Sequence, residues 1–97
     1  MLPGVIRSFA DLETKRLFLT GRSRRLPADV IQRAKRKLQI LDSATDLKDL
    51  ASPPGNRLES LRGDREGQHS IRINNQFRLC FRWKNGDAYD VEVADYH

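Results

Sequence analysis

Residues 77–93 read FRLCFRWKNGDAYDVEV, and apolar and polar residues alternate along this stretch on both sides of Asn85-Gly86. Alternation with a period of two is typical of β-strands with one buried face. Asn-Gly is typical of a tight turn between two such strands. The large apolar residues are all at odd positions: Phe77, Leu79, Phe81, Trp83, Tyr89, Val91 and Val93. The stretch therefore predicts a β-hairpin that buries one face.

The register of this hairpin depends on which positions share a face. A two-residue loop at Asn85-Gly86 would set odd positions against even ones and mismatch the faces. A three-residue loop, Lys84-Asn85-Gly86 with glycine in the left-handed conformation, sets apolar residues opposite one another. The pairs it predicts are Phe81 with Tyr89, Leu79 with Val91 and Phe77 with Val93, and on the polar face Arg78 with Glu92 and Cys80 with Asp90.

Upstream of the hairpin the pattern predicts two more strands, at residues 57–61 and 69–73, joined by a polar turn at residues 63–67. Earlier still it predicts a short strand at residues 5–9. A capping pattern at residues 8–11 then starts a helix that runs to about Thr20 and stops at Gly21.

A second helix is predicted to begin at Pro27. Its apolar residues recur at three- and four-residue steps, which gives one packed face and one basic face. The packed face carries Val30, Ile31, Ala34, Leu38 and Leu41. Residues 46–50 predict one further turn, and residues 52–56 a non-helical crossing into the strands.

This order of elements predicts an α+β fold in one domain over residues 1–97. Two N-terminal helices would pack on one face of a mainly antiparallel, four- to five-stranded sheet. The other face would be concave and rich in arginine, with the end of the chain beside it. Residues 1–4 precede the first strand and are interpreted as an N-terminal extension.

The composition restricts the partners of such a domain. The 97 residues carry 18 basic and 13 acidic side chains, a net charge of +5, and 13 of the bases are arginine. Because the arginine fork binds phosphate in two places and stacks on bases, this charge favours RNA or DNA over a membrane surface. No apolar run approaches the roughly 20 residues of a membrane span, and no signal-peptide pattern opens the sequence. We therefore expect a cytosolic protein.

Metal and disulfide chemistry is not expected. Cys80 is the only cysteine, and His69 and His97 are the only histidines, which leaves no zinc-type ligand spacing and no internal disulfide. Cys80 and His69 are interpreted as structural side chains of their strands. The chain is thus expected to need no metal ion and no other cofactor.

The candidate catalytic group is Asp95-Tyr96-His97, which joins a carboxylate, a phenol and an imidazole directly after a strand. RNA is cut without a metal ion when a base removes the 2′-hydroxyl proton, cations stabilise the charge on phosphorus and an acid protonates the leaving 5′-oxygen. His97 suits the proton transfer near neutral pH, and Tyr96 suits base stacking or hydrogen bonding. A solvated tail is the alternative for this tripeptide.

Arginines are the candidate phosphate-binding residues, and solvated side chains with a few ion pairs are the alternative. One group belongs to the predicted sheet and its turns: Arg62, Arg65, Arg72, Arg78 and Arg82. A second group forms a basic loop between the helices, which suits RNA or an acidic partner: Arg22, Arg24 and Arg25. Glu59 is either a general base or an ion-pair partner of Arg57 and Arg62, and the ion pair is favoured.

Several segments, taken together, carry a family resemblance. They read PPGNRLE at residues 53–59, GDR at 63–65, GQHSIRIN at 67–74, FRLCF at 77–81 and DYH at 95–97, with IRSF at 6–9 and LDSA at 41–44 upstream. This set, which covers nearly the whole chain, strongly resembles the HigB toxins of the RelE/ParE superfamily. The resemblance implies the compact fold of those toxins and membership of a type II toxin–antitoxin pair.

The resemblance also implies an activity and its partners. HigB toxins are ribosome-dependent endoribonucleases that cut messenger RNA in the ribosomal A site and so inhibit translation and growth. The expected partners are the 70S ribosome with its message and a HigA-like helix-turn-helix antitoxin. The toxin is expected to contact DNA only indirectly, through this antitoxin, and to contact no membrane. The matching positions are Asp95, Tyr96 and His97, Arg78 on the penultimate strand and Arg62 before the Gly-Asp-Arg turn. His97 would transfer a proton, and Arg62 and Arg78 would bind the scissile phosphate.

The chain departs from the family pattern at Glu59, where some HigB toxins carry a second histidine. The base is therefore either Glu59 or another group. Two functions of other classes are alternatives: a non-catalytic basic module that blocks RNA or the ribosome by binding, and a gyrase poison like the ParE relatives. Only the ribosome-dependent nuclease leaves new RNA 5′ ends locked to codon position.

Overall fold

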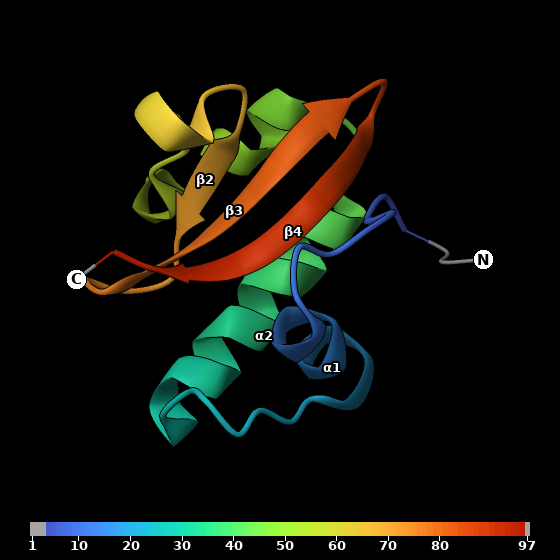
Figure 1. The fold of residues 1–97 in the computed structure, drawn as a ribbon. Coiled ribbons are helices and arrows are strands. Elements are labelled where there is room, and N and C mark those ends of the chain that lie inside the picture. The colour runs from blue at the N-terminus through green and yellow to red at the C-terminus, as the bar shows by residue number, and fades with distance from the viewer. Residues whose placement is uncertain (1–3, 97) are drawn as a thin grey trace.

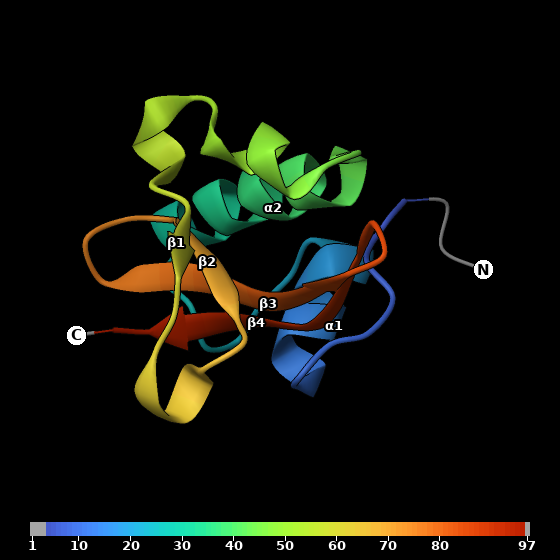
Figure 2. The ribbon, with the colours of Figure 1, turned by 90° about the horizontal axis from the view of Figure 1, so that it is seen from above.

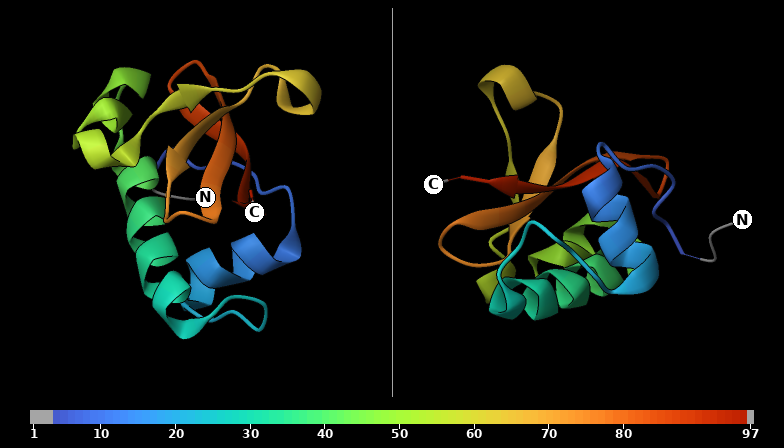
Figure 3. Two further views of the ribbon diagram at one scale, coloured as in Figure 1. Left: turned by 90° about the vertical axis from the view of Figure 1, so that its left-hand side faces the viewer. Right: turned by 60° about the horizontal axis from the view of Figure 1, so that its bottom comes forward.

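The computed structural model describes residues 4–96; Met1–Pro3, which belong to the expected N-terminal extension, and His97 lie outside the described residues. Within this range two helices, α1 (Leu12–Thr20) and α2 (Ala28–Ser43), precede four strands, β1 (Glu59–Ser60), β2 (His69–Arg72), β3 (Phe77–Lys84) and β4 (Asp87–Asp95). The strands form an antiparallel sheet in the order β1-β2-β3-β4. Both helices lie on the same side of it (Figures 1 and 3), which confirms the predicted α+β fold.

Local sequence signals explain the boundaries of both helices. The Asp11 carboxylate caps α1 by accepting a hydrogen bond from the Thr14 backbone N–H at 2.8 Å. Gly21, at φ 75°, ends the helix in the left-handed conformation. The helix α2 begins at Ala28, one residue later than predicted, with Pro27 as its N-cap, and its buried side chains are Val30, Ala34, Leu38 and Leu41.

The alternation along β3 places one of its faces in the core. Leu79 and Phe81 are fully buried and belong to the same apolar cluster as the buried stripe of α2. Trp83 is half-buried and packs against this cluster, which confirms its interpretation as a packing residue. The even positions of β3, which carry Arg78 and Arg82, therefore belong to the other face of the sheet.

The turn of the hairpin differs from the predicted one. Lys84 pairs with Asp87, so the loop is the two-residue Asn85-Gly86, with φ of 52° and 82° as in a type I′ turn. Further along, Asp90, at φ 52°, is an extra residue in β4, where the register shifts. The three-residue loop is thus wrong, and a tight turn followed by a β-bulge takes its place.

The bulge also corrects the predicted pairs. Arg82, rather than Phe81, faces Tyr89, and beyond the bulge Leu79 faces Val93, Phe77 faces Asp95, Cys80 faces Glu92 and Arg78 faces Ala94. Apolar residues of the two strands still share a face, because one extra residue in β4 changes the parity as a three-residue loop would.

Residues 5–9, predicted as the first strand, run beside β4 as two isolated parallel bridges, Ile6 with Ala88 and Phe9 with Val91. The bulge lies between the two bridges, and there the Asp90 backbone N–H donates to the Ser8 hydroxyl at 2.9 Å. The bulged strand cannot continue a regular ladder with this segment. Among residues 4–96 the sheet therefore has four strands.

Two other predicted segments are shorter or differently folded than expected. Of residues 57–61 only Glu59–Ser60 form a strand. This strand lies at the edge of the sheet beside β2 and leads into the 3₁₀ turn η3 (Gly63–Arg65), as Figure 2 shows. The predicted non-helical crossing at 52–56 contains a second 3₁₀ turn, η2 (Pro54–Asn56). The turn predicted at 46–50 is the 3₁₀ turn η1 (Leu47–Ala51), capped by Asp46.

Thr14 joins α1 to the sheet and allows a test of this arrangement. Its side chain is 1% exposed, and its hydroxyl accepts a hydrogen bond from the Val93 backbone N–H at 3.0 Å. Thr14→Val keeps the shape of the side chain but leaves that buried N–H unpaired, so we expect the free energy of unfolding to fall by about 1–3 kcal/mol. Urea denaturation measures the loss. Thr20→Val removes an exposed hydroxyl whose partners, the Arg16 carbonyl and the Arg22 backbone N–H, water can reach. It is expected to change stability by less than about 0.5 kcal/mol, and equal losses at both positions would contradict the role of Thr14.

Candidate active site

The candidate site lies on the face of the sheet that the helices leave uncovered, here called the open face. One row of paired residues crosses it, from Glu59 in β1 through Ser70 and Cys80 to Glu92 in β4. Because every second residue of a strand points to the same face, Arg78 shares this face with Cys80. In the right-hand view of Figure 3 the helices lie beneath the sheet and the turn η3 rises on the other side.

Arg78 is held in place by three neighbours. Its side chain is 12% exposed, and its Nη2 pairs with Glu59 Oε1 at 3.2 Å. Its Nε donates to the Ser70 hydroxyl at 2.6 Å, and its Nη2 donates to the Arg57 carbonyl, also at 2.6 Å. A guanidinium fixed in this way is preorganised to bind an anion through its remaining N–H groups. The predicted ion pair of Glu59 is therefore confirmed, with Arg78 as its partner rather than Arg57 or Arg62.

Tyr96, a member of the predicted catalytic tripeptide, reaches the same face. Its backbone N–H donates to the Gln76 carbonyl at 2.6 Å, and its hydroxyl lies 3.7 Å from Cys80 Sγ. Partial burial, followed by the contact with Cys80, raises the pKa of Tyr96 to about 12, although the charges of Arg65 and Arg78 lower it slightly. The phenol is therefore protonated at neutral pH and available as a hydrogen-bond donor.

Asp95 and the strand residues Cys80 and His69 have simpler environments than Tyr96. Asp95 accepts a hydrogen bond from Gln76 Nε2 at 3.2 Å. Burial raises the pKa of the Cys80 thiol, and burial lowers the pKa of His69, whose ring lies 6.0 Å from that of Phe81. Both agree with their interpretation as structural residues. His97, the predicted proton donor, lies outside the described residues.

The raised pKa of Tyr96 predicts the behaviour of the chain in alkali. Because the folded chain holds this proton more tightly than the unfolded chain, folding stability falls once the pH exceeds about 10, the ordinary pKa of tyrosine, and the loss continues until the pH reaches about 12. We expect an ultraviolet titration of the tyrosines to contain a component with a midpoint near 12. Tyr96→Phe is expected to remove that component, and a titration unchanged by this substitution would contradict the assignment.

Arg65 reaches the open face from the turn η3. Its Nη1 donates to Gln68 Oε1 at 3.1 Å and to Glu92 Oε1 at 3.0 Å. The bond to Glu92 raises the pKa of Arg65 against the opposing effect of partial burial. Sequence reasoning misses Glu92 as this partner because the three-residue loop sets Glu92 opposite Arg78. Glu92 can be identified as the partner only from the register beyond the bulge, which places Glu92 opposite Cys80.

The remaining predicted arginines of the sheet have separate environments. Arg82 pairs with Asp90 of the bulge at 3.4 Å, and Arg72 donates to Asn75 Oδ1 in the turn between β2 and β3. The Arg62 side chain is exposed and forms no hydrogen bond or ion pair with any residue that the structure describes. Of the predicted site residues, the structure thus brings Arg65, Arg78, Tyr96 and Glu59 together most closely.

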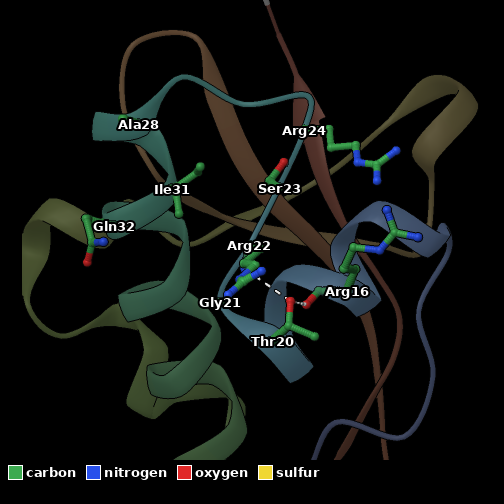
Figure 4. A pocket seen from close by; sticks show the side chains of 9 residues that line it. All are labelled: Arg16, Thr20, Gly21, Arg22, Ser23, Arg24, Ala28, Ile31 and Gln32. Atoms are coloured by element: carbon green, nitrogen blue, oxygen red, sulfur yellow. Dashed lines mark hydrogen bonds between the residues drawn. The ribbon is translucent and has the colours of Figure 1, made fainter.

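Two arginines of the basic loop border a different hollow. Arg22 and Arg24 line, together with Arg16, a cavity of about 900 Å³ between the end of α1 and the start of α2 (Figure 4). The Thr20 hydroxyl accepts a hydrogen bond from the Arg22 backbone N–H at 3.2 Å. The described residues that line this cavity include no carboxylate, histidine or tyrosine, so it suits anion binding rather than proton transfer.

Arg25 of the same loop adjoins the candidate site. It pairs with Asp11 at 3.3 Å. It also lines a hollow of about 510 Å³ along β4, together with Arg65, Glu92 and Asp95. The predicted loop arginines therefore belong to two places, and only Arg25 borders the residues of the open face.

Comparison with known proteins agrees with the fold. A family model described as a RelE-like toxin of the type II toxin–antitoxin system HigB matches residues 7–97. The chain belongs to this toxin family. Within it, Toxin HigB-1 of Vibrio cholerae serotype O1 is 48% identical over 70 residues, which are 72% of this chain and 74% of that relative. Endoribonuclease HigB of Proteus vulgaris is 38% identical over 93 residues, 96% of this chain and 100% of that relative.

Solved structures share the fold of this HigB-like toxin at low sequence identity. The YoeB–YefM complex from Staphylococcus aureus has a TM-score of 0.58 at 17% identity and covers 95% of this chain and 94% of its own. A heterotetrameric YoeB–YefM toxin–antitoxin complex from the same organism has a TM-score of 0.57 at 14% identity, with coverages of 95% and 97%. These structures support the RelE-like fold.

Two further properties concern metals and membranes. Within residues 4–96 no three histidine, cysteine, aspartate or glutamate side chains lie close enough together to hold a metal ion. In the same part of the chain no helix is both long enough and apolar enough to cross a membrane.

Proposed function

We propose that this toxin is a ribosome-dependent endoribonuclease that cuts messenger RNA in the A site and thereby inhibits translation and growth. The observation that carries the proposal is Arg78, fixed by Ser70 and Arg57 next to Glu59 and close enough to Tyr96 to affect its pKa. A cation, a carboxylate and a phenol on one face are groups that stabilise a phosphate and move protons. The toxin family and the relative named Endoribonuclease HigB support this assignment.

In the proposed reaction the 2′-hydroxyl attacks the adjacent phosphate of the message. Glu59 accepts the 2′-hydroxyl proton on the carboxylate oxygen that is not paired with Arg78. The O2′–P bond forms as the P–O5′ bond breaks, and protonated His97 donates a proton to the leaving 5′-oxygen. Arg78 and Arg62 stabilise the extra negative charge on the phosphate oxygens. The products are a 2′,3′-cyclic phosphate and a 5′-hydroxyl end, and the reaction uses no metal ion or cofactor.

The other candidate residues position the RNA. Tyr96, which is 45% exposed, donates a hydrogen bond or stacks on a base. Asp95 keeps the end of β4 in place through Gln76. The flanking phosphates are bound by the remaining arginines of the sheet and the loop: Arg65, Arg72, Arg82, Arg22, Arg24 and Arg25.

Partners follow from this proposal. The ribosome holds the message against a site with few acid–base groups, and such positioning supplies a large part of the rate. A HigA-like helix-turn-helix antitoxin neutralises the toxin and binds operator DNA, so the toxin contacts DNA only through it. The toxin acts in the cytoplasm, where translation takes place.

A comparison of cleavage rates tests the dependence on the ribosome. The purified chain is mixed with one messenger RNA, either free or on translating ribosomes with an open A site. We expect cleavage to be at least about a hundredfold faster on the ribosome, because the site relies on a positioned substrate. Equal rates on both substrates would contradict ribosome dependence.

A further inference from the structure

Three arginines of the sheet and the turn η3 are already paired with carboxylates. Arg78 pairs with Glu59 at 3.2 Å, Arg65 with Glu92 at 3.0 Å and Arg82 with Asp90 at 3.4 Å. On the helices and their connecting loop, by contrast, several arginines have no ion pair with any described residue: Arg22, Arg24, Arg33 and Arg36. The open face therefore offers a phosphate fewer free cations than the net charge of +5 suggests.

Among these three carboxylates, Glu92 is the most buried. The side chain of Glu92 is 28% exposed, whereas Glu59 is 58% and Asp90 53% exposed. Glu92 also lies opposite Cys80, whose thiol contacts the Tyr96 hydroxyl. Solvent and salt screen a partly buried ion pair less than an exposed one. Glu92 is thus the carboxylate among these three that solvent screens least.

An RNA phosphate and Glu92 compete for the same guanidinium. The Nη1 of Arg65 is occupied by Glu92 and Gln68. A phosphate that enters the hollow of about 510 Å³ beside β4 meets both Arg65 and Glu92, which line it. It is attracted by the first and repelled by the second. To bind Arg65 through Nη1 it must displace the carboxylate.

We propose that Glu92 is a specificity-determining residue, which occupies Arg65 in the RNA-free toxin and so weakens the binding of free RNA. The inference rests on the proposed function and deepens it. A message held on the ribosome is present at a high effective concentration and overcomes the competition. Free RNA in solution does not, and Glu92 thereby favours ribosome-bound substrate.

Binding of a short single-stranded RNA with 2′-O-methyl groups tests the proposal, because such an RNA cannot be cut. Fluorescence anisotropy compares the wild-type chain with Glu92→Gln. We expect Glu92→Gln to bind about three- to fivefold more tightly, the gain that corresponds to one released ion pair. The affinity of Glu92→Gln is also expected to fall more steeply with salt concentration. The slope of log affinity against log salt should increase by the amount that corresponds to about one additional phosphate contact.

Two controls separate this effect from a general change in charge. Glu66→Gln makes the same change one residue from Arg65, at an exposed side chain that forms no ion pair with any described residue. The second control is Arg65→Gln, alone and combined with Glu92→Gln, which completes a double-mutant cycle. The gain from Glu92→Gln is expected to exceed that from Glu66→Gln and to fall to the Glu66→Gln level in the Arg65→Gln background. Equal gains at the two glutamates, or a Glu92→Gln gain that stays above the Glu66→Gln level without Arg65, would overturn the role of Glu92.

The proposed function is tested independently by the wild-type chain. Absence of cleavage on translating ribosomes overturns the proposed function, whatever the affinities for free RNA. Cleavage on ribosomes together with equal gains at Glu92 and Glu66 overturns only the inference about Glu92. Thermal unfolding followed by circular dichroism confirms that each variant compared is folded.

Discussion

Arg78→Lys is expected to lower the rate of cleavage of ribosome-bound message by about a hundredfold and to abolish growth arrest. A loss of this size is typical when an enzyme loses one fixed hydrogen-bond donor to the charge that develops in the transition state. The positive charge remains, but a lysine cannot bond to Ser70, the Arg57 carbonyl and Glu59 with one planar fork. The cation is then no longer fixed at the position of the phosphate. Cleavage of a defined message on translating ribosomes measures the effect.

The matched control for this substitution is Arg33→Lys. Arg33 is exposed on α2, on the other side of the sheet, and forms no hydrogen bond or ion pair through its side chain with any described residue. The same chemical change there is expected to leave cleavage within about twofold of the wild type, because an exposed side chain without partners loses little. If Arg78→Lys cleaved as fast as Arg33→Lys, the fixed geometry of Arg78 would have no role in catalysis.

His97→Ala is expected to lower the cleavage rate by about a hundredfold to ten-thousandfold, the range typical of losing a general acid. The last described backbone bond joins the Tyr96 N–H to the Gln76 carbonyl and anchors the end of β4 through the main chain. The melting temperature of the variant is therefore expected to match that of the wild type.

A second substitution separates proton transfer from binding at this position. His97→Gln keeps a hydrogen-bonding side chain but cannot move a proton at neutral pH. Its cleavage rate is expected to be as low as that of His97→Ala, and imidazole in the buffer is expected to restore part of the rate in the alanine variant. Unchanged toxicity in both variants would remove the end of the chain from the mechanism.

Alternation of apolar residues predicts which side chains share a face but not how far two strands are offset. The odd positions of residues 77–93 place Leu79 and Val93 in the core, as expected. Their offset depends on Asp90, which adopts a positive φ and adds one residue to β4. Aspartate tolerates this conformation better than most residues. Nothing in the pattern distinguishes such a bulge from a longer turn, so the sequence leads to the right faces and the wrong pairs.

In the candidate site, too, some features are predictable from the sequence and others are not. Arg78 and Tyr96 are identified by the family resemblance, and the structure brings both to the open face. The ion pair between Arg65 and Glu92 joins residues 27 positions apart, and no local pattern predicts a contact over that separation. The basic loop is also divided by tertiary packing, because Arg25 adjoins β4 whereas Arg22 and Arg24 line the cavity between the helices. Which arginines act together is thus a property of the fold.

Mapping of RNA 5′ ends in cells that express the toxin without an antitoxin tests the central claim most directly. The wild-type chain is expected to produce new 5′-hydroxyl ends inside translated messages, at a fixed position within codons, and Arg78→Lys is expected to produce none. Growth arrest without such ends would contradict the nuclease and favour a module that blocks by binding. Arrest accompanied by DNA breaks instead of RNA ends would favour a gyrase poison.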